Sequence, residues 1–139
     1  MKQAQTKMTV TPNGRGMTDI TRQVEEYLTE TNIQTGMLHL FVQHTSCSLL
    51  IQENADPTVQ ADLERFLSRL APDGDPMFRH ASEGPDDMPA HIRAALTATS
   101  LSIPVGQGKM VLGIWQGIYL YEHRQHPSTR TMIIHVSGY

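Results

Sequence analysis

Alternating apolar and polar residues predict β-strands in the first third of the chain. Such alternation marks residues 4–11, 37–44 and 47–52, and successive side chains of a strand point to opposite faces. In this interpretation His44 continues the apolar row of residues 38, 40 and 42 at the edge of a buried face. A buried imidazole needs a partner, which a backbone carbonyl, a carboxylate or a metal ion would supply. A satisfied core histidine is the simpler alternative.

Apolar residues with a helical period predict three helices. The first follows Thr21, where apolar residues recur at spacings of three and four. The second begins at Pro57, because Asp56 is a good N-cap and proline suits the first helical position. The third opens at Pro89 and runs to about Thr97. We expect the second helix to bury a stripe formed by Val59, Leu63, Phe66, Leu67 and Leu70.

The second half of the chain adds a long loop and more strands. Residues 72–88 form an acidic loop with proline and glycine, and loops of this length are often functional. Strands are predicted over residues 101–105, 110–122, as one strand or a pair, and 130–136. Strands dominate and the helices stand between them, so the sequence predicts one α+β domain over residues 1–139.

Composition excludes several classes of function. The 139 residues carry a net charge of −3, which gives no basic field for nucleic acid. No run of about 18 apolar residues is present, so no membrane span is expected. A single cysteine, Cys47, fits a reducing, cytoplasmic setting. The seven histidines are many for this length and point weakly to metal or acid–base chemistry.

Five blocks of residues resemble the signature of the YjbQ family. They are His44-Thr45-Ser46, Asn54-Ala55-Asp56-Pro57, the segment from Glu83 to Ile92, Trp115-Gln116-Gly117-Ile118-Tyr119, and Glu122-His123-Arg124. The resemblance covers nearly the whole chain, in order. It implies an α+β fold in which mixed β-sheets pack with about three helices, and a homotrimer with candidate sites at subunit boundaries.

The resemblance also implies an activity. Members of the family are described as weak thiamine-phosphate synthases, transferases that join a pyrimidine diphosphate to a thiazole phosphate. The implied partner is therefore a small phosphorylated heterocycle. Two positions depart from the family pattern: Cys47 replaces a small residue, and Pro127-Ser128 replaces a Gly-Gly pair. Pro127 has no N–H to offer, which would alter any phosphate grip by that loop.

Three histidines of these blocks are the best candidate metal ligands. The resemblance maps His44, His80 and His91 onto a strand end, the long loop and the third helix. Three imidazoles with one open position are typical of a catalytic site for a divalent metal, zinc before magnesium. Their spacing matches no local motif, so separately hydrogen-bonded histidines remain the alternative. His123 and Glu53 are reserve ligands, and Asp87 and its neighbours are possible partners of the imidazoles.

Candidate phosphate donors form a second group. Arg124 and Arg130 carry forked donors that suit phosphate, and Ser46 and Ser48 add hydroxyls. Surface ion pairs are the alternative for both arginines. Trp115, with Gln116 and Tyr119 beside it, is a candidate wall for a flat heterocycle, although such aromatics are more often core.

Three functions remain open at this stage. In the synthase, His80 is the candidate general acid or base, with Asp87 in an acidic pair suited to magnesium. In a zinc-dependent hydrolase of a phosphate ester or small amide, the three histidines hold zinc and Glu53 or Glu83 is the base. The third possibility is a non-catalytic, metal- or ligand-binding trimer.

Overall fold

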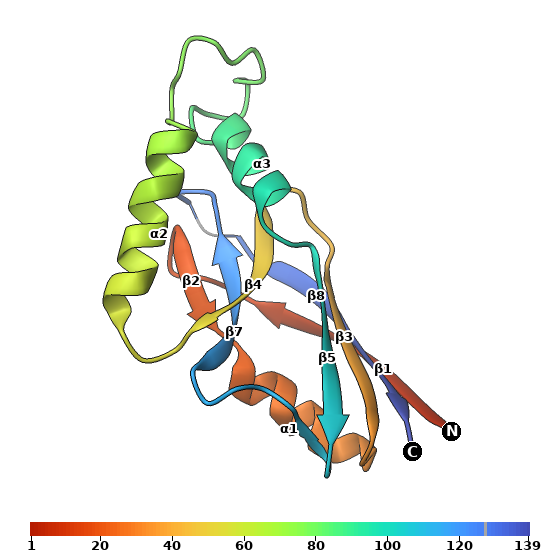
Figure 1. Cartoon of the computed structure of the whole chain (residues 1–139). Helices are drawn as coiled ribbons and strands as arrows, with labels where there is room; N and C mark the ends of the chain where they lie inside the picture. Colours follow the sequence, from red (N-terminus) through yellow and green to blue (C-terminus); the bar gives the residue numbers. More distant parts are fainter. Residues whose placement is uncertain (127) are drawn as a thin grey trace.

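Two β-sheets and three helices make up the α+β fold of the computed structural model, which describes every residue except Pro127 (Figure 1). The helices are α1 (Thr21–Thr31), α2 (Pro57–Leu70) and α3 (Asp87–Leu96). The strands are β1 (Lys2–Val10), β2 (Gly16–Asp19), β3 (Gly36–Val42), β4 (Cys47–Glu53), β5 (Ser100–Gly106), β6 (Lys109–Met110), β7 (Gln116–Glu122) and β8 (Arg130–Gly138).

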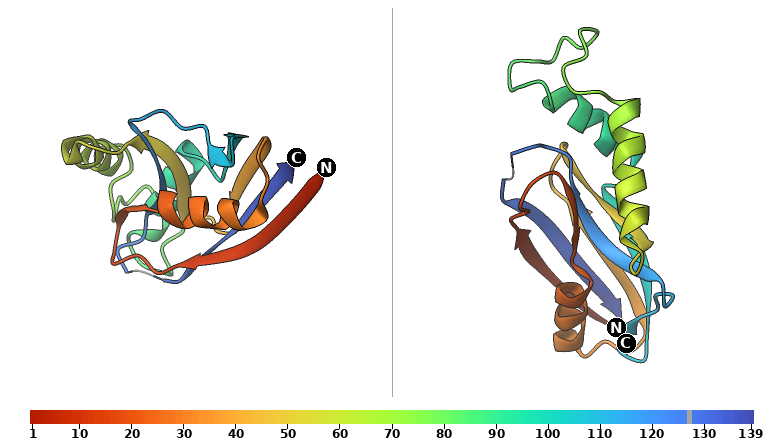
Figure 2. Two further views of the ribbon diagram at one scale, coloured as in Figure 1. Left: turned by 90° about the horizontal axis from the view of Figure 1, so that it is seen from below. Right: turned by 90° about the vertical axis from the view of Figure 1, so that its left-hand side faces the viewer.

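The larger sheet has the order β1-β8-β3-β5-β6 and the smaller one β2-β7-β4. Every strand pair among the described residues is antiparallel, so the mixed sheets implied by the resemblance are corrected. The two termini lie side by side because β1 and β8 pair along their whole length (Figure 2). In the described part of the chain, no helix is long and apolar enough to cross a membrane.

The core joins the inner faces of the sheets to α1. On α1, the predicted stripe is confirmed, with Val24 and Leu28 fully buried. On β3, Leu38, Leu40 and Val42 are buried, whereas the alternate residues His39 and Phe41 are exposed. The strand pattern of this segment is therefore confirmed up to residue 42.

Helix α2 begins where the sequence predicts, but its apolar stripe is not buried. The Asp56 carboxylate accepts the backbone N–H of Thr58 at 2.9 Å, which confirms the N-cap. Of the expected stripe only Leu67 is buried, and Phe66 is 63 % exposed. The physical reason is that the face of α2 turned toward the fold is partly polar: beside Leu67 it carries Glu64, whose carboxylate accepts hydrogen bonds from side chains of α3 and β7. The prediction of a buried apolar face was wrong.

Other elements follow the prediction only in part. Of the two alternatives for residues 110–122 the pair is confirmed, but β6 has only two residues, and an irregular segment, residues 111–115, separates it from β7 and exposes Ile114 and Trp115. Strand β2 was missed, because four residues are too few to show a clear alternation. Helix α3 begins at Asp87, two residues earlier than expected, which places this carboxylate in the first helical turn.

The long loop between α2 and α3 arches over the N-terminal end of α3 (Figures 1 and 2). A backbone hydrogen bond of 3.0 Å from Gly74 N–H to the Pro85 carbonyl ties its two ends together. Gly84 has φ of 111°, a value that favours glycine, just before the chain enters the helix. The closed loop brings His80 back to the start of α3.

Candidate metal centre

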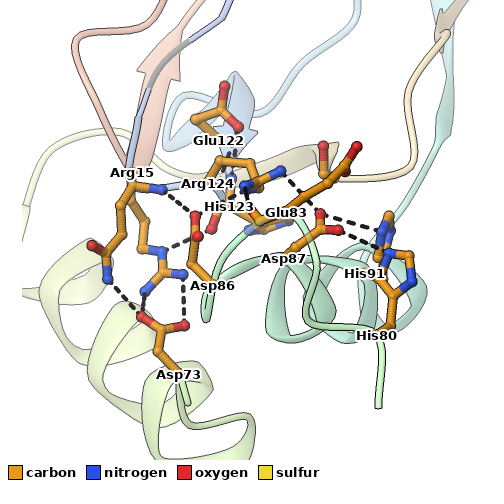
Figure 3. A network of polar contacts seen from close by, with 12 residues as sticks. Arg15, Asp73, His80, Glu83, Asp86, Asp87, His91, Glu122, His123 and Arg124 are labelled. Carbon is orange, nitrogen blue, oxygen red and sulfur yellow. Dashed lines mark hydrogen bonds and ion pairs between the residues drawn. The ribbon is translucent and has the colours of Figure 1, made fainter. Parts of the chain in front are cut away.

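Two histidines and one aspartate meet at the start of α3. One ligand atom from each of His80, Asp87 and His91 lies within 4.8 Å of the other two. Nε2 of His80 is 2.8 Å from Asp87 Oδ2, and Nε2 of His91 is 3.4 Å from Asp87 Oδ1 (Figure 3). The two imidazole rings are 5.2 Å apart, centre to centre. Both rings therefore aim a nitrogen at the same carboxylate.

Local structure explains how these residues converge. Asp87 and His91 are four residues apart in α3, a spacing that places two side chains on one face of a helix. His80 comes from the loop instead, and its side chain is half exposed. The cluster thus combines two groups fixed by a helix with a third that solvent reaches.

The imidazole of His91 is oriented by the backbone. Its Nδ1 lies 2.8 Å from the Thr45 carbonyl oxygen. A carbonyl only accepts, so Nδ1 must carry the ring proton and the lone pair is left on Nε2, the atom that faces Asp87. Metal-bound histidines are typically held by this kind of contact.

Arg124 holds one oxygen of Asp87 and leaves the other free. Its guanidinium donates to Asp87 Oδ1 at 3.0 Å, to Asp86 Oδ2 at 2.9 Å and to the Glu83 carbonyl at 2.7 Å (Figure 3). Asp87 Oδ2 is buried and accepts no well-aligned hydrogen bond from any described residue, since the approach of His80 lacks the required angle. A buried carboxylate oxygen of this kind is suited to a cation.

The same guanidinium affects the neighbouring carboxylate. Burial alone would raise the pKa of Asp86, but the hydrogen bonds from Arg124 and from the Gln125 N–H lower it overall. Asp86 therefore stays ionised and shares the positive charge of Arg124 with Asp87. Arg124, predicted as a phosphate donor, is occupied by these two aspartates and by a carbonyl.

His44 is not part of the cluster, which corrects the expected three-histidine arrangement. Its Nε2 accepts the Thr131 backbone N–H at 2.8 Å, because the chain leaves β3 before residue 44 and turns toward β8. His44 and His91 nevertheless line one cavity of about 250 Å³. Asp87, which was expected to act in catalysis or beside the histidines, is the third member of the cluster.

The other predicted site residues lie outside the cluster. Glu53 accepts the backbone N–H groups of Ala55 and Asp56, so it orders the turn before α2. Trp115 is 60 % exposed, on the segment before β7. The expectation that Pro127 alters a phosphate-binding loop concerns a residue that lies outside the described residues.

Arg130 forms a buried ion pair with Glu122. Nε of Arg130 donates to Glu122 Oε1 at 2.8 Å, and Nη2 contacts both the other carboxylate oxygen and the Ser46 hydroxyl. The Glu122 side chain is fully buried and that of Arg130 is 5 % exposed. Sequence reasoning kept an ion pair as the alternative role of Arg130 but expected it at the surface, whereas the structure buries it.

Ser48 belongs to a second buried polar group. Its hydroxyl lies 2.8 Å from His123 Nε2 and 2.6 Å from the Thr97 hydroxyl. Ser48 and His123 are both fully buried, so neither meets solvent. Next to them in the core, burial raises the pKa of the Cys47 thiol to about 12, which makes it a poor nucleophile.

His123 gives the fold a predictable dependence on pH. Burial, and then the charges of Arg93, Arg15 and Arg130, lower the pKa of His123 from 6.5 to about 3. Between these two pKa values His123 binds a proton in the unfolded chain but not in the folded chain. The stability of the fold is therefore highest above pH 6.5 and decreases as the pH falls toward 3. Each pH unit in this window removes up to about 1.4 kcal/mol.

Urea unfolding at pH 7, 6 and 5 measures this effect. The variant His123→Gln is expected to flatten the dependence, whereas the same change at the exposed His39 leaves the wild-type slope. An unchanged slope in His123→Gln would show that another group controls the loss.

Known proteins of similar sequence span nearly the whole chain. A protein of Synechocystis sp., called UPF0047 protein sll1880, is 45% identical over 137 residues, which cover 99% of this chain and 93% of that protein. The UPF0047 protein YjbQ of Escherichia coli O157:H7 is 42% identical, over 96% of this chain and 97% of its own length.

Solved structures share the fold. The conserved hypothetical protein TT1486 of Thermus thermophilus superposes with a TM-score of 0.85 at 37% identity, covering 95% of this chain and 99% of its own. A YbjQ-like protein of Sulfolobus solfataricus, described as being of unknown function, superposes with a TM-score of 0.89 at 24% identity, covering 99% of both chains, and it supports the fold alone.

These comparisons correct the expected activity. The matching family model is described as UPF0047 protein YjbQ-like, and neither it nor these relatives carries the name of an activity. The thiamine-phosphate synthase, the zinc hydrolase and the non-catalytic trimer expected as functions find no support there. The resemblance itself is confirmed: the family model matches residues 6–139, and the chain belongs to the YjbQ-like UPF0047 family.

Proposed function

We propose that this protein binds one divalent transition-metal ion through His80, Asp87 and His91. The observation that carries the proposal is the convergence of three ligand atoms within 4.8 Å, one from each side chain. The Thr45 carbonyl leaves the lone pair of His91 on the atom facing the cluster. Arg124 leaves one oxygen of Asp87 free for the ion. Each of the three side chains thus offers one donor atom to the same cluster.

The donor set favours zinc over magnesium. Imidazole nitrogen is a good ligand for zinc and neighbouring transition metals, whereas magnesium is held almost entirely by oxygen. Two imidazoles and a carboxylate give three ligands, and zinc in such sites takes a fourth from water or a bound molecule. The site is partly open on the side of His80, whose side chain is 52% exposed, so that a fourth ligand has access.

Metal content after chelation and reloading tests the proposal. Protein stripped with a chelator, reloaded with zinc and dialysed is expected to retain about one zinc per chain, measured by mass spectrometry of the elements. His80→Gln should lose most of this zinc, and the matched change His39→Gln, at an exposed histidine on β3, should keep it. Equal zinc in both variants, or none in the wild type, would refute the site.

A second proposal concerns assembly: the chain forms a homotrimer. Support comes from α2, where Phe66 and Leu70 are 63% and 55% exposed. Two large apolar side chains exposed on one face of a helix are often covered by a partner. Light scattering after gel filtration should give three times the chain mass of 15.5 kDa. A monomer mass for the wild type would exclude the trimer. A trimer undisturbed by Phe66→Lys combined with Leu70→Lys would show that the subunits do not meet through this face of α2.

We also propose that the protein works in the cytoplasm. Its single cysteine is buried and unpaired, as is common in proteins of a reducing compartment.

A further inference from the structure

The hydrogen bonds of His44 fix which of its nitrogens carries the proton. Nε2 accepts the backbone N–H of Thr131 at 2.8 Å, so this nitrogen has no proton of its own. Burial, and then the charge of Arg130, lower the pKa of His44, although Glu122 acts in the opposite direction. The ring is therefore neutral near pH 7. A neutral imidazole has a single N–H, which must be on Nδ1.

This proton faces another donor. Nδ1 of His44 lies 3.4 Å from Nη1 of Arg130, and a guanidinium nitrogen never accepts a hydrogen bond. The side chain of Arg130 is 5% exposed. In the part of the chain that the structure describes, Nη1 has no other partner, because Nε and Nη2 alone serve Glu122 and Ser46. Two donors thus meet with no acceptor between them, a state that folded proteins avoid.

A third donor lies beside them. The Ser46 hydroxyl oxygen accepts from Arg130 Nη2 at 3.0 Å, which leaves the hydroxyl hydrogen free to donate. His44 also lines a cavity of about 250 Å³, together with Thr45 and with His91 of α3. The sequence singled out Ser46 and Arg130 as phosphate donors, and the structure adds His44 to them.

We infer that the group accepting these hydrogen bonds is an oxygen of a small oxyanion, a carboxylate or a phosphate, bound between His44 Nδ1, Arg130 Nη1 and Ser46 Oγ. A water molecule fits this place poorly. It would have to accept from three donors and would still need acceptors for its own two hydrogens, whereas an oxyanion brings only acceptors. The site uses no atom of the proposed metal cluster and does not depend on it.

Nitrogen NMR of the His44 ring tests the inference in the full-length wild type. Inorganic phosphate and acetate are each added to protein as purified and to chelator-treated protein, with sodium chloride at equal ionic strength as the reference. We expect a proton on Nδ1 and a saturable shift of that nitrogen with at least one oxyanion, half complete at or below about 1 mM. The response to each anion shows whether the site takes phosphate or carboxylate.

Variants sharpen the result. His44→Gln supplies an amide oxygen that can accept from Arg130, so calorimetry should show the binding of the same anion weakened at least about tenfold. His39→Gln should bind as the wild type does. A ring proton on Nε2, a response that chloride reproduces, or no response to either oxyanion would overturn the inference. Binding that disappears on chelation would overturn it too, since it would place the anion on a metal ion.

Discussion

Asp87→Asn is expected to lower the affinity for zinc by at least about 100-fold, because it replaces an anionic ligand with a neutral amide of the same size. Asp87 is the member of the cluster whose carboxylate is almost fully buried, and its Oδ2 faces His80 with no aligned hydrogen bond from the described residues. The two imidazoles alone would keep only weak binding. Zinc affinity is measured by competition with a chelator of known affinity.

The matched control is the same change one residue earlier. Asp86 also pairs with Arg124, at 2.9 Å, but it offers no ligand atom to the cluster. Asp86→Asn therefore reproduces the loss of an ion pair to Arg124 without the loss of a ligand, and it should change zinc affinity much less. If the two variants weaken zinc equally, Asp87 acts through Arg124 rather than on the metal.

Glu122→Gln is expected to reduce the free energy of unfolding by about 3–5 kcal/mol, the usual cost of leaving one partner of a buried ion pair unpaired. Its carboxylate is fully buried, and besides Arg130 it accepts the backbone N–H groups of His123 and Arg124. With glutamine in its place, the guanidinium of Arg130 is left buried without a counter-charge. Urea unfolding at pH 7 measures the loss.

The contrast is with an exposed pair of the same kind. Arg22 and Glu26 lie four residues apart on α1 at 2.9 Å, with side chains 88% and 61% exposed. Glu26→Gln should change the free energy of unfolding by less than about 1 kcal/mol, because water screens such pairs. A small effect of Glu122→Gln, similar to that of Glu26→Gln, would mean that the buried pair is no more important than a surface one.

Local signals in the sequence were enough for some elements of the fold. The capping aspartate at residue 56 and the following proline gave the start of α2 correctly, since both act on the nearest backbone groups. The apolar face of α2 was misjudged because burial depends on what a helix packs against. Here Glu64 reaches Arg93 and Tyr121, which are 29 and 57 residues away, and no local pattern reports such partners.

The candidate site was predicted in part for the same reason. The resemblance pointed to His80 and His91. The shared helical face of Asp87 and His91 was not predicted, because the helix was expected to begin only at Pro89. His44 lies outside the metal cluster because of the path of the chain after β3, where the backbone N–H of Thr131 in β8 donates a hydrogen bond to one nitrogen of its ring. That contact joins residues 87 positions apart and appears only in the folded chain.

X-ray absorption at the zinc edge of the reloaded protein tests the central claim most directly. If His80, Asp87 and His91 hold the ion, the spectrum will show two imidazole nitrogens and oxygen neighbours, at about 2.0–2.2 Å. In His80→Gln, measured with enough zinc added to occupy the weakened site, the imidazole signal per zinc should fall by half. Sulfur in the spectrum, a shell of oxygen alone, or an imidazole signal unchanged in His80→Gln would contradict it.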